Sequence, residues 1–179
     1  MVALYSLLAI MAGMSNKECH TLTLMVGLPR SGKSSWIKDH ARDAVVVSPD
    51  WIRENILGEK YSYANSANAI VWSIMDSTLR IVLGQGKDAI LDGVNLTKET
   101  RSYYVAIARQ HGARVLMMMI KTPLEVCLQR NRDAANRKLP DEKLIKMAST
   151  IEWPEQDEAD ELRCDMPSFE TTPFWRATT

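Results

Sequence analysis

Residues 27–34 (GLPRSGKS) constrain the fold more than any other part of this 179-residue chain. They fit the pattern G-x-x-x-x-G-K-[ST], in which Gly27 and Gly32 permit backbone angles closed to other residues. The loop can then turn successive N–H groups inward. An apolar run at 21–26 precedes the loop, and a helical pattern at 33–41 follows it. A strand, this loop and a helix in that order predict a site for the phosphates of a nucleoside triphosphate.

The polar side chains of the loop have distinct expected tasks. Lys33 would place its ammonium on the β- and γ-phosphates, and the hydroxyl of Ser34 is a candidate ligand of Mg²⁺. The alternative, a glycine-rich turn with a surface lysine, is disfavoured because a strand precedes the loop and a helix follows it. The predicted nucleotide-binding residues are Gly27, Pro29, Arg30, Ser31, Gly32, Lys33, Ser34 and Ser35.

Short apolar runs alternate with helical patterns along the chain. Strands are predicted at 21–26, 44–47, 89–91, 115–120 and 162–166, and helices at 33–41, from 49, 67–83, from 97, 123–128 and 141–151. This alternation predicts an α/β fold of the P-loop NTPase type. It has three layers, α/β/α, around a mostly parallel sheet of about five strands. We expect the second strand to lie beside the strand of the phosphate loop.

Polar residues follow several of these strands. Because ligands of such sheets bind outside the carboxyl ends of the strands, we expect these residues to meet at one rim. Asp92 ends the third strand, where an acid on the Mg²⁺ side is expected. Asn95 is expected to hold the following loop, and a purely structural Asx turn remains an alternative for both residues.

The composition is that of a globular protein, 46% hydrophobic and 25% charged, with a formal net charge of zero. A neutral chain disfavours a broad nucleic-acid coat, although a narrow basic channel stays possible. The three scattered cysteines indicate reduced thiols and a cytoplasmic protein. Residues 1–14 are apolar, but they lack a basic n-region and are too short to span a bilayer, so no membrane association is expected.

Five segments carry a resemblance to a known family: SGKSSW, SPDWIRE, LDGVNLTKETR, EVCLQRNRD and EWPEQDEADEL. Together they resemble the kinase domain of phage-type polynucleotide 5′-hydroxyl kinases and the related small P-loop (AAA-like) kinases, which have an adenylate-kinase-like fold. The similarity covers about residues 21–166. It implies a kinase domain at 21–166, an N-terminal extension at 1–20 without an assigned role, and a C-terminal tail at 167–179. Met11 or Met14 is an alternative start.

The resemblance implies transfer of the γ-phosphate of ATP to a hydroxyl, with Mg²⁺. In the D-x-x-R motif it implies that Asp50 is the general base and that Arg53 contacts the acceptor phosphate, beside Lys33 as a further catalytic residue. A capping Asp with a solvent-facing Arg is the alternative. Trp51, next in sequence, would either stack on a base of the acceptor or, as we favour, pack against the fold.

The basic segment 130–138 resembles the lid loop of this family, which brings arginines over the phosphates. The resemblance implies catalytic roles for Arg132 and Arg137 and nucleotide contact for Arg130. The register departs from the phage enzyme near Ala134, where an arginine is expected, and a solvated charge run is the alternative.

The acceptor expected from the resemblance is the 5′-hydroxyl of a polynucleotide. Two alternatives remain open: a small-molecule or protein kinase on the same scaffold, and an ATP-binding module with weak ATPase activity. Asp50 beside the phosphate loop argues against the last, because a pure binder needs no base. The sequence predicts no oligomeric state.

Overall fold

The computed structural model describes residues 20–58, 65–135 and 138–166, without the side chains of 65–67. Five strands form one sheet in which every pairing is parallel, in the order β2-β3-β1-β4-β5. The strands are β1 (Thr21–Val26), β2 (Val45–Val47), β3 (Ala89–Leu91), β4 (Arg114–Ile120) and β5 (Glu161–Asp165). The predicted sheet, with its fifth strand at an edge, is confirmed.

One expectation about the sheet is wrong. We expected β2 beside β1, but β3 lies between them: Leu91 of β3 pairs with Leu24 of β1 on one side and with Val47 of β2 on the other. The sequence of a strand as short as β2, with three residues, does not show which strand it will pair with. The β2–β3 pairing depends on which strand the α4 crossover returns to.

Helices cover both faces of the sheet. They are α2 (Lys33–His40), α3 (Pro49–Asn55), α4 (Asn65–Gly84), α5 (Lys98–Gln110), α6 (Leu124–Asp133) and α7 (Asp141–Ser149), with a short 3₁₀ turn η1 (Gln156–Glu158). Alternate residues of β1 separate the two faces. Leu22 and Leu24 pack with α4 and α5, whereas Met25 packs with Ile37 of α2. Burying an apolar side chain of this size stabilises the fold by roughly 1.5–3 kcal/mol. Because β1 has such side chains on both faces, helices on both sides of the sheet are favoured.

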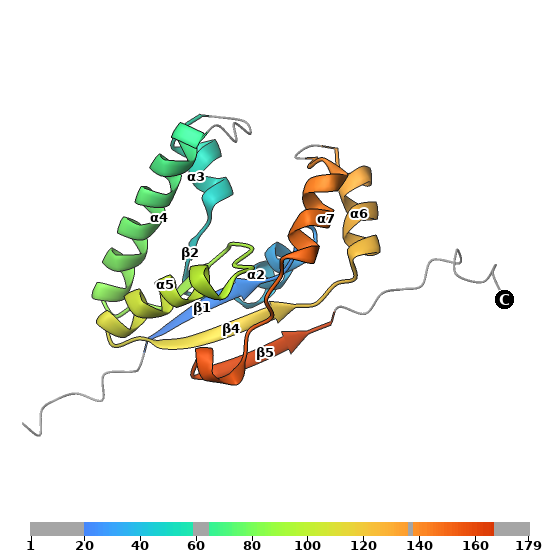
Figure 1. The fold of residues 1–179 in the computed structure, drawn as a ribbon. Coiled ribbons are helices and arrows are strands. Elements are labelled where there is room, and N and C mark those ends of the chain that lie inside the picture. The colour runs from blue at the N-terminus through green and yellow to red at the C-terminus, as the bar shows by residue number, and fades with distance from the viewer. Residues whose placement is uncertain (1–19, 59–64, 136–137, 167–179) are drawn as a thin grey trace, which may run out of the picture.

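Two pairs of helices stand above the sheet in the view of Figure 1. The first pair, α3 and α4, follows β2, and the second pair, α6 and α7, follows β4. In Figure 1 they stand on opposite sides of the molecule, with the sheet below them. We call them the α3–α4 arm and the α6–α7 arm.

The α6 helix is longer than expected. The sequence predicted a helix at 123–128 and a loop from 130, but α6 continues to Asp133. Polar side chains stabilise its last turn: the Gln129 amide donates to the Asp133 carboxylate at 3.0 Å. The amide of Asn131, which is 2% exposed, donates to the Leu139 carbonyl and accepts from the Leu139 N–H. The first part of the predicted loop, residues 130–133, is therefore helical.

None of the helices within the described ranges is long and apolar enough to cross a membrane. Residues 1–19 and 167–179, the bulk of the predicted extension and the predicted tail, lie outside those ranges.

Candidate active site

The loop between β1 and α2 has the tight geometry that its glycines predict. Gly27 has φ +152°, and a Cβ there would lie 2.7 Å from the Ile120 carbonyl oxygen of β4. Gly32 has φ +110° and caps α2. Arg30 also adopts a positive φ, +67°, which is uncommon for a residue with a side chain. At position 27, where the loop lies closest to β4, only glycine can therefore be accommodated.

Side chains from the α6–α7 side brace this loop. The Thr122 hydroxyl donates to the Ser31 carbonyl at 2.7 Å, and Ser31 is fully buried. The guanidinium of Arg130 donates from Nη1 to the carbonyls of Arg30 and Ser31, at 3.1 and 3.3 Å. On the other side, the Gly27 N–H donates to Val94 at 3.2 Å. The loop is thus fixed from both sides before any phosphate binds.

Lys33 is buried at the start of α2. Its Nζ donates to the carbonyls of Gly27 and Leu28, at 2.9 and 2.7 Å. Burial lowers the pKa of Lys33 to about 8, although the nearby Asp92, Cys127 and Asp50 oppose this shift. A buried ammonium held by two carbonyls and, at 3.5 Å, by the Ser31 hydroxyl would gain strongly from an anion, because a hydrogen bond between two charged groups is stronger than one to a neutral oxygen.

Asp92 faces the same centre from the end of β3. Burial raises the pKa of its carboxyl, while Lys33 and a hydrogen bond from Ser48 oppose that rise. Its backbone N–H donates to Val47 of β2 at 2.9 Å. Asp92 and Ser34 line the same cavity. Oxygens of this kind suit Mg²⁺, which is commonly held by one or two protein oxygens together with substrate phosphates. The residues therefore fit the ATP and Mg²⁺ expected from the sequence.

Asp50 and Arg53 lie together on α3, as their spacing predicts. Arg53 Nη1 lies 3.2 Å from Asp50 Oδ1, and Nη2 donates to Asn68 of α4 at 2.8 Å. The Arg53 side chain is 9% exposed, whereas that of Asp50 is 46% exposed. Asp50 is therefore accessible to a ligand, while the buried guanidinium of Arg53 donates to its carboxylate.

Two cavities meet at the phosphate loop. The first, of about 590 Å³, is lined by Asp50, Arg53 and Asp92 together with residues of both arms. The second, of about 460 Å³, lies over Ser35 and Trp36 of α2 and includes Arg130 and Asp165. Lining residues common to both are Arg30, Lys33 and Ser34. We call them the acid cavity and the tryptophan-36 cavity. Pro29 lines the former.

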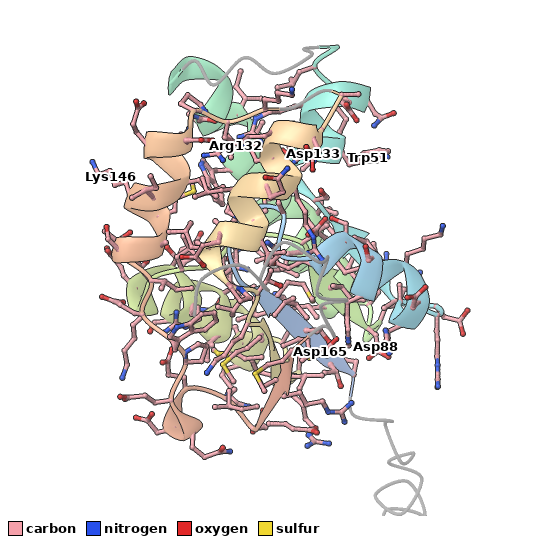
Figure 2. The ribbon with its side chains drawn as sticks, turned by 90° about the vertical axis from the view of Figure 1, so that its right-hand side faces the viewer. Trp51, Asp88, Arg132, Asp133, Lys146 and Asp165 are labelled. Carbon is pink, nitrogen blue, oxygen red and sulfur yellow. The ribbon has the colours of Figure 1, made fainter. Side chains whose placement is uncertain are left out.

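The three arginines expected over the phosphates have different places. Arg130 reaches the loop from α6. Arg132, near the end of α6 on the side of α7 (Figure 2), donates instead from Nε and Nη2 to Asp141, at 3.0 and 2.8 Å, and lines neither cavity. Arg137 falls outside the described residues. The sequence did not separate Arg130 from Arg132, because only the completed helix shows which one faces the loop.

Trp51 is more exposed than expected. We favoured packing, but the residue is 57% exposed, lines neither cavity and lies at the margin of the view in Figure 2. The aromatic residue of the acid cavity is Trp72 of α4, which sequence reasoning missed. The signal was the spacing of Asn68, Trp72 and Met75, which places all three on one helix face.

Asn95 holds the loop after β3. It has φ +42°, is 4% exposed, and its amide donates to the Met25 carbonyl of β1 at 2.8 Å. Behind it, the fully buried Arg101 donates to the carbonyls of Asn95 and Glu152, at 3.2 and 2.6 Å. Arg101 also makes two bonds to the Glu158 carboxylate, at 2.8 and 2.9 Å. Residues 93–97, which line the acid cavity, are therefore clamped from both sides.

Comparisons with known proteins agree with this geometry. A family model described as an AAA domain matches residues 22–154. The L-seryl-tRNA(Sec) kinase of Methanococcus maripaludis is 24% identical over 144 residues, which are 74% of this chain and 53% of that protein. The chain thus spans about half the length of this curated relative.

Two solved structures show the same fold. A chain of the Pnkp1/Rnl/Hen1 RNA repair complex matches with a TM-score of 0.66 at 17% identity, covering 76% of this chain and 45% of that one. The Mycobacterium tuberculosis APS kinase CysC, in complex with AMPPNP and APS, matches with a TM-score of 0.58 at 16% identity, covering 84% and 91%. Since the family model spans most of the chain, this protein belongs to the AAA-domain family of P-loop kinases.

Proposed function

We propose that this protein is an ATP-dependent phosphotransferase that moves the γ-phosphate of ATP to the 5′-hydroxyl of a polynucleotide. One observation carries the proposal: two cavities meet at Lys33 and Ser34, and one of them contains the accessible carboxylate of Asp50. A kinase must hold a nucleotide and an acceptor on opposite sides of the transferred phosphoryl group.

The donor side is the phosphate loop with the tryptophan-36 cavity. ATP would place its phosphates on the loop N–H groups, and Lys33 would exchange its bonds to Gly27 and Leu28 for bonds to phosphate oxygens. Arg130 is placed to stabilise charge there. Mg²⁺ held by Ser34 and Asp92 would neutralise charge on the phosphates.

The acceptor side is the acid cavity. Asp50 would accept the proton of the acceptor hydroxyl as its oxygen forms a bond to the γ-phosphorus. The bond from that phosphorus to the β–γ bridging oxygen breaks, and ADP leaves with the electron pair. Arg53 would orient the Asp50 carboxylate. The phosphorylated acceptor, ADP and the proton on Asp50, which then passes to solvent, account for every atom of the two substrates.

The polynucleotide acceptor is supported by the five resembling segments and by relatives whose names refer to RNA. A small-molecule acceptor is the second candidate, favoured by the APS kinase, since the chain covers 91% of that enzyme. The zero formal net charge favours a short contact with any nucleic acid, near its end only.

The deciding experiment is a transfer assay with γ-labelled ATP and three acceptors: a 5′-hydroxyl oligonucleotide, gluconate and water. We expect label on the oligonucleotide alone, and none with Lys33→Ala. Label on gluconate but not on the oligonucleotide would establish the second candidate, and release of phosphate to water alone would indicate an ATPase module. Near-native turnover by Lys33→Ala would show that the loop is not the active site.

A further inference from the structure

The acid cavity has an apolar side that phosphoryl transfer alone does not explain. Trp72 and Met75 line it from α4, and Leu139 and Met147 line it from the α6–α7 arm. Trp72 is 47% exposed and lines the cavity, so its indole is accessible to a ligand bound there. The two sets of residues belong to the two arms that rise above the sheet.

A chain of contacts connects Trp72 on α4 with Asp50 on α3. Asn68, one helical turn before Trp72, accepts the hydrogen bond of Arg53, which in turn holds Asp50. Trp72 therefore lies on the same face of α4 as the contact to the D-x-x-R motif. A molecule whose hydroxyl reaches Asp50 would extend into the cavity that the indole ring also lines.

The wall beside Trp72 is less suited to a polyol acceptor than the polar wall formed by Asn95, Thr97 and Thr100. A sugar needs a hydrogen-bond partner for most of its hydroxyls, and a site that lacks them leaves polar groups unpaired. Here Arg53 and Asn68 are already bonded to one another. The half-exposed Trp72, with the partly buried Met147 on the other arm, instead suits a flat ring, because indole and thioether groups both make favourable contacts with aromatic faces.

We propose that Trp72 is the stacking platform for a planar ring of the acceptor, and that this ring is the base of the 5′-terminal nucleotide. The assignment rests on the proposed kinase function and names its recognition element. Stacking on an aromatic side chain is tolerant of sequence, since every base has a π-face, so it would select nucleic-acid ends without selecting a base. Lys143, from α7, lines the same cavity and adds a cation beside the ring.

The test compares two acceptors and three variants. The acceptors are a 5′-hydroxyl oligonucleotide and the same oligonucleotide with an abasic 5′-terminal residue. The variants are Trp72→Ala, Trp72→Phe and, as matched control, Trp51→Ala, which also removes an exposed tryptophan but from outside the cavity. Steady-state kinetics gives the KM for each acceptor and for ATP.

Wild-type protein should use the abasic acceptor about ten-fold less well or worse, on the scale of base stacking. Trp72→Ala should lower kcat/KM for the intact acceptor by a similar factor, leave the KM for ATP unchanged, and have little further effect on the abasic acceptor. Trp72→Phe should retain most activity, and Trp51→Ala should behave as wild type.

Equal use of the intact and abasic acceptors by the wild type would overturn the stacking proposal and leave the kinase function standing. An equal loss on both acceptors in Trp72→Ala would also overturn it, since the effect would then not involve the base. No transfer to either oligonucleotide, with label on another acceptor, would reject the polynucleotide function itself.

Discussion

Lys33 shows how a single residue can make nucleotide binding depend on pH. Burial lowers its pKa to about 8, so above that pH the folded protein without nucleotide contains mainly the neutral amine. Triphosphate binding favours the ammonium and raises the pKa again. We therefore expect ATP affinity to fall as pH rises above about 8, and binding near pH 8.5–9 to take up protons.

Calorimetric titration of ATP in two buffers of different ionisation enthalpy measures this proton uptake. Lys33→Arg is the control, because a guanidinium stays protonated throughout this range. Equal uptake in Lys33→Arg and wild type would assign the proton to another group. The same shift makes the contribution of Lys33 to the free energy of unfolding rise from about pH 8 to 10.5, where only the unfolded state holds the proton.

Asp50 can be tested by a change that keeps its contacts. Asp50→Asn retains an oxygen that can accept from Arg53 Nη1 but has no basicity. We expect turnover to fall by about 10²- to 10⁴-fold, the usual scale for loss of a general base, with ATP affinity nearly intact. Asp43→Asn, an exposed residue outside both cavities, is the matched control.

Rapid single-turnover measurements, with ATP binding followed separately, give both quantities for this comparison. Full turnover per folded molecule in Asp50→Asn, together with reduced stability, would assign Asp50 a structural role. That role would not be the predicted cap with a solvent-facing Arg, because Ser48 caps α3 and Arg53 is buried. Because Arg53 forms an ion pair with Asp50, we expect Arg53→Ala to change the kcat of transfer as well as acceptor binding. Removing Arg53 frees the Asp50 carboxylate, so a lower kcat is expected as well as a higher acceptor KM.

The sequence predicted some residues of this site better than others, for physical reasons. The residues of the phosphate loop, 27–33, lie within one short segment, so their spacing in the sequence was enough to predict that they form one site. The partners of Arg53 and Arg132 lie on other elements, Asn68 and Asp141. Local sequence cannot specify such partners, and it could not show that Arg132 pairs with α7 while Arg130 reaches the loop.

At the scale of elements, the loop after β3 depends on a buried ion pair. The side chains of Arg101 and Glu158 are 0% and 5% exposed. Removing one partner of such a pair leaves a buried charge and costs about 3–5 kcal/mol, whereas replacing both by apolar residues is often much less harmful. Arg101→Met should therefore destabilise the fold strongly, and Arg101→Met with Glu158→Leu should recover most of that loss.

Recovery of stability should not restore the acceptor site. In the double variant the carbonyls of Asn95 and Glu152 still lack the Nη1 donor, so the cavity wall at 93–97 loses its clamp. We expect a raised acceptor KM with a nearly normal KM for ATP. Urea unfolding and steady-state kinetics on both variants measure the two effects. An unchanged acceptor KM in the double variant would show that the Arg101–Glu158 ion pair contributes to stability and not to acceptor binding.

The strand order also belongs to this scale. The sequence located all five strands within about a residue of their bounds, and β1, β3 and β4 are the buried apolar runs that a parallel sheet covered by helices requires. The hydrophobic pattern did not place β3 between β1 and β2. That order depends on pairing between distant segments. It places Asp92, at the end of the strand next to β1, near enough to Lys33 for the ammonium to oppose the rise that burial causes in the pKa of its carboxyl.

At the scale of the whole molecule, the charge balance limits how the proposed nucleic-acid acceptor could bind. The chain has 22 basic and 22 acidic residues, and the acid cavity presents Arg53 and Lys143. Counterion release scales with the number of phosphates neutralised, by about 0.7 per phosphate for single strands. With one or two phosphates held, the logarithm of acceptor affinity should fall with the logarithm of salt concentration with a slope of only about −0.7 to −1.4.

Acceptor KM measured between low and moderate salt, for a short and a long 5′-hydroxyl oligonucleotide, gives this slope. Both lengths should show the same shallow value, because only the terminal nucleotide enters the cavity between the arms. Lys143→Ala should make the slope shallower, whereas Lys38→Ala, an exposed lysine of α2 outside both cavities, should not. A steep slope that grows with oligonucleotide length would instead require an extended basic track, and the terminal-nucleotide contact would then be only part of a longer interface.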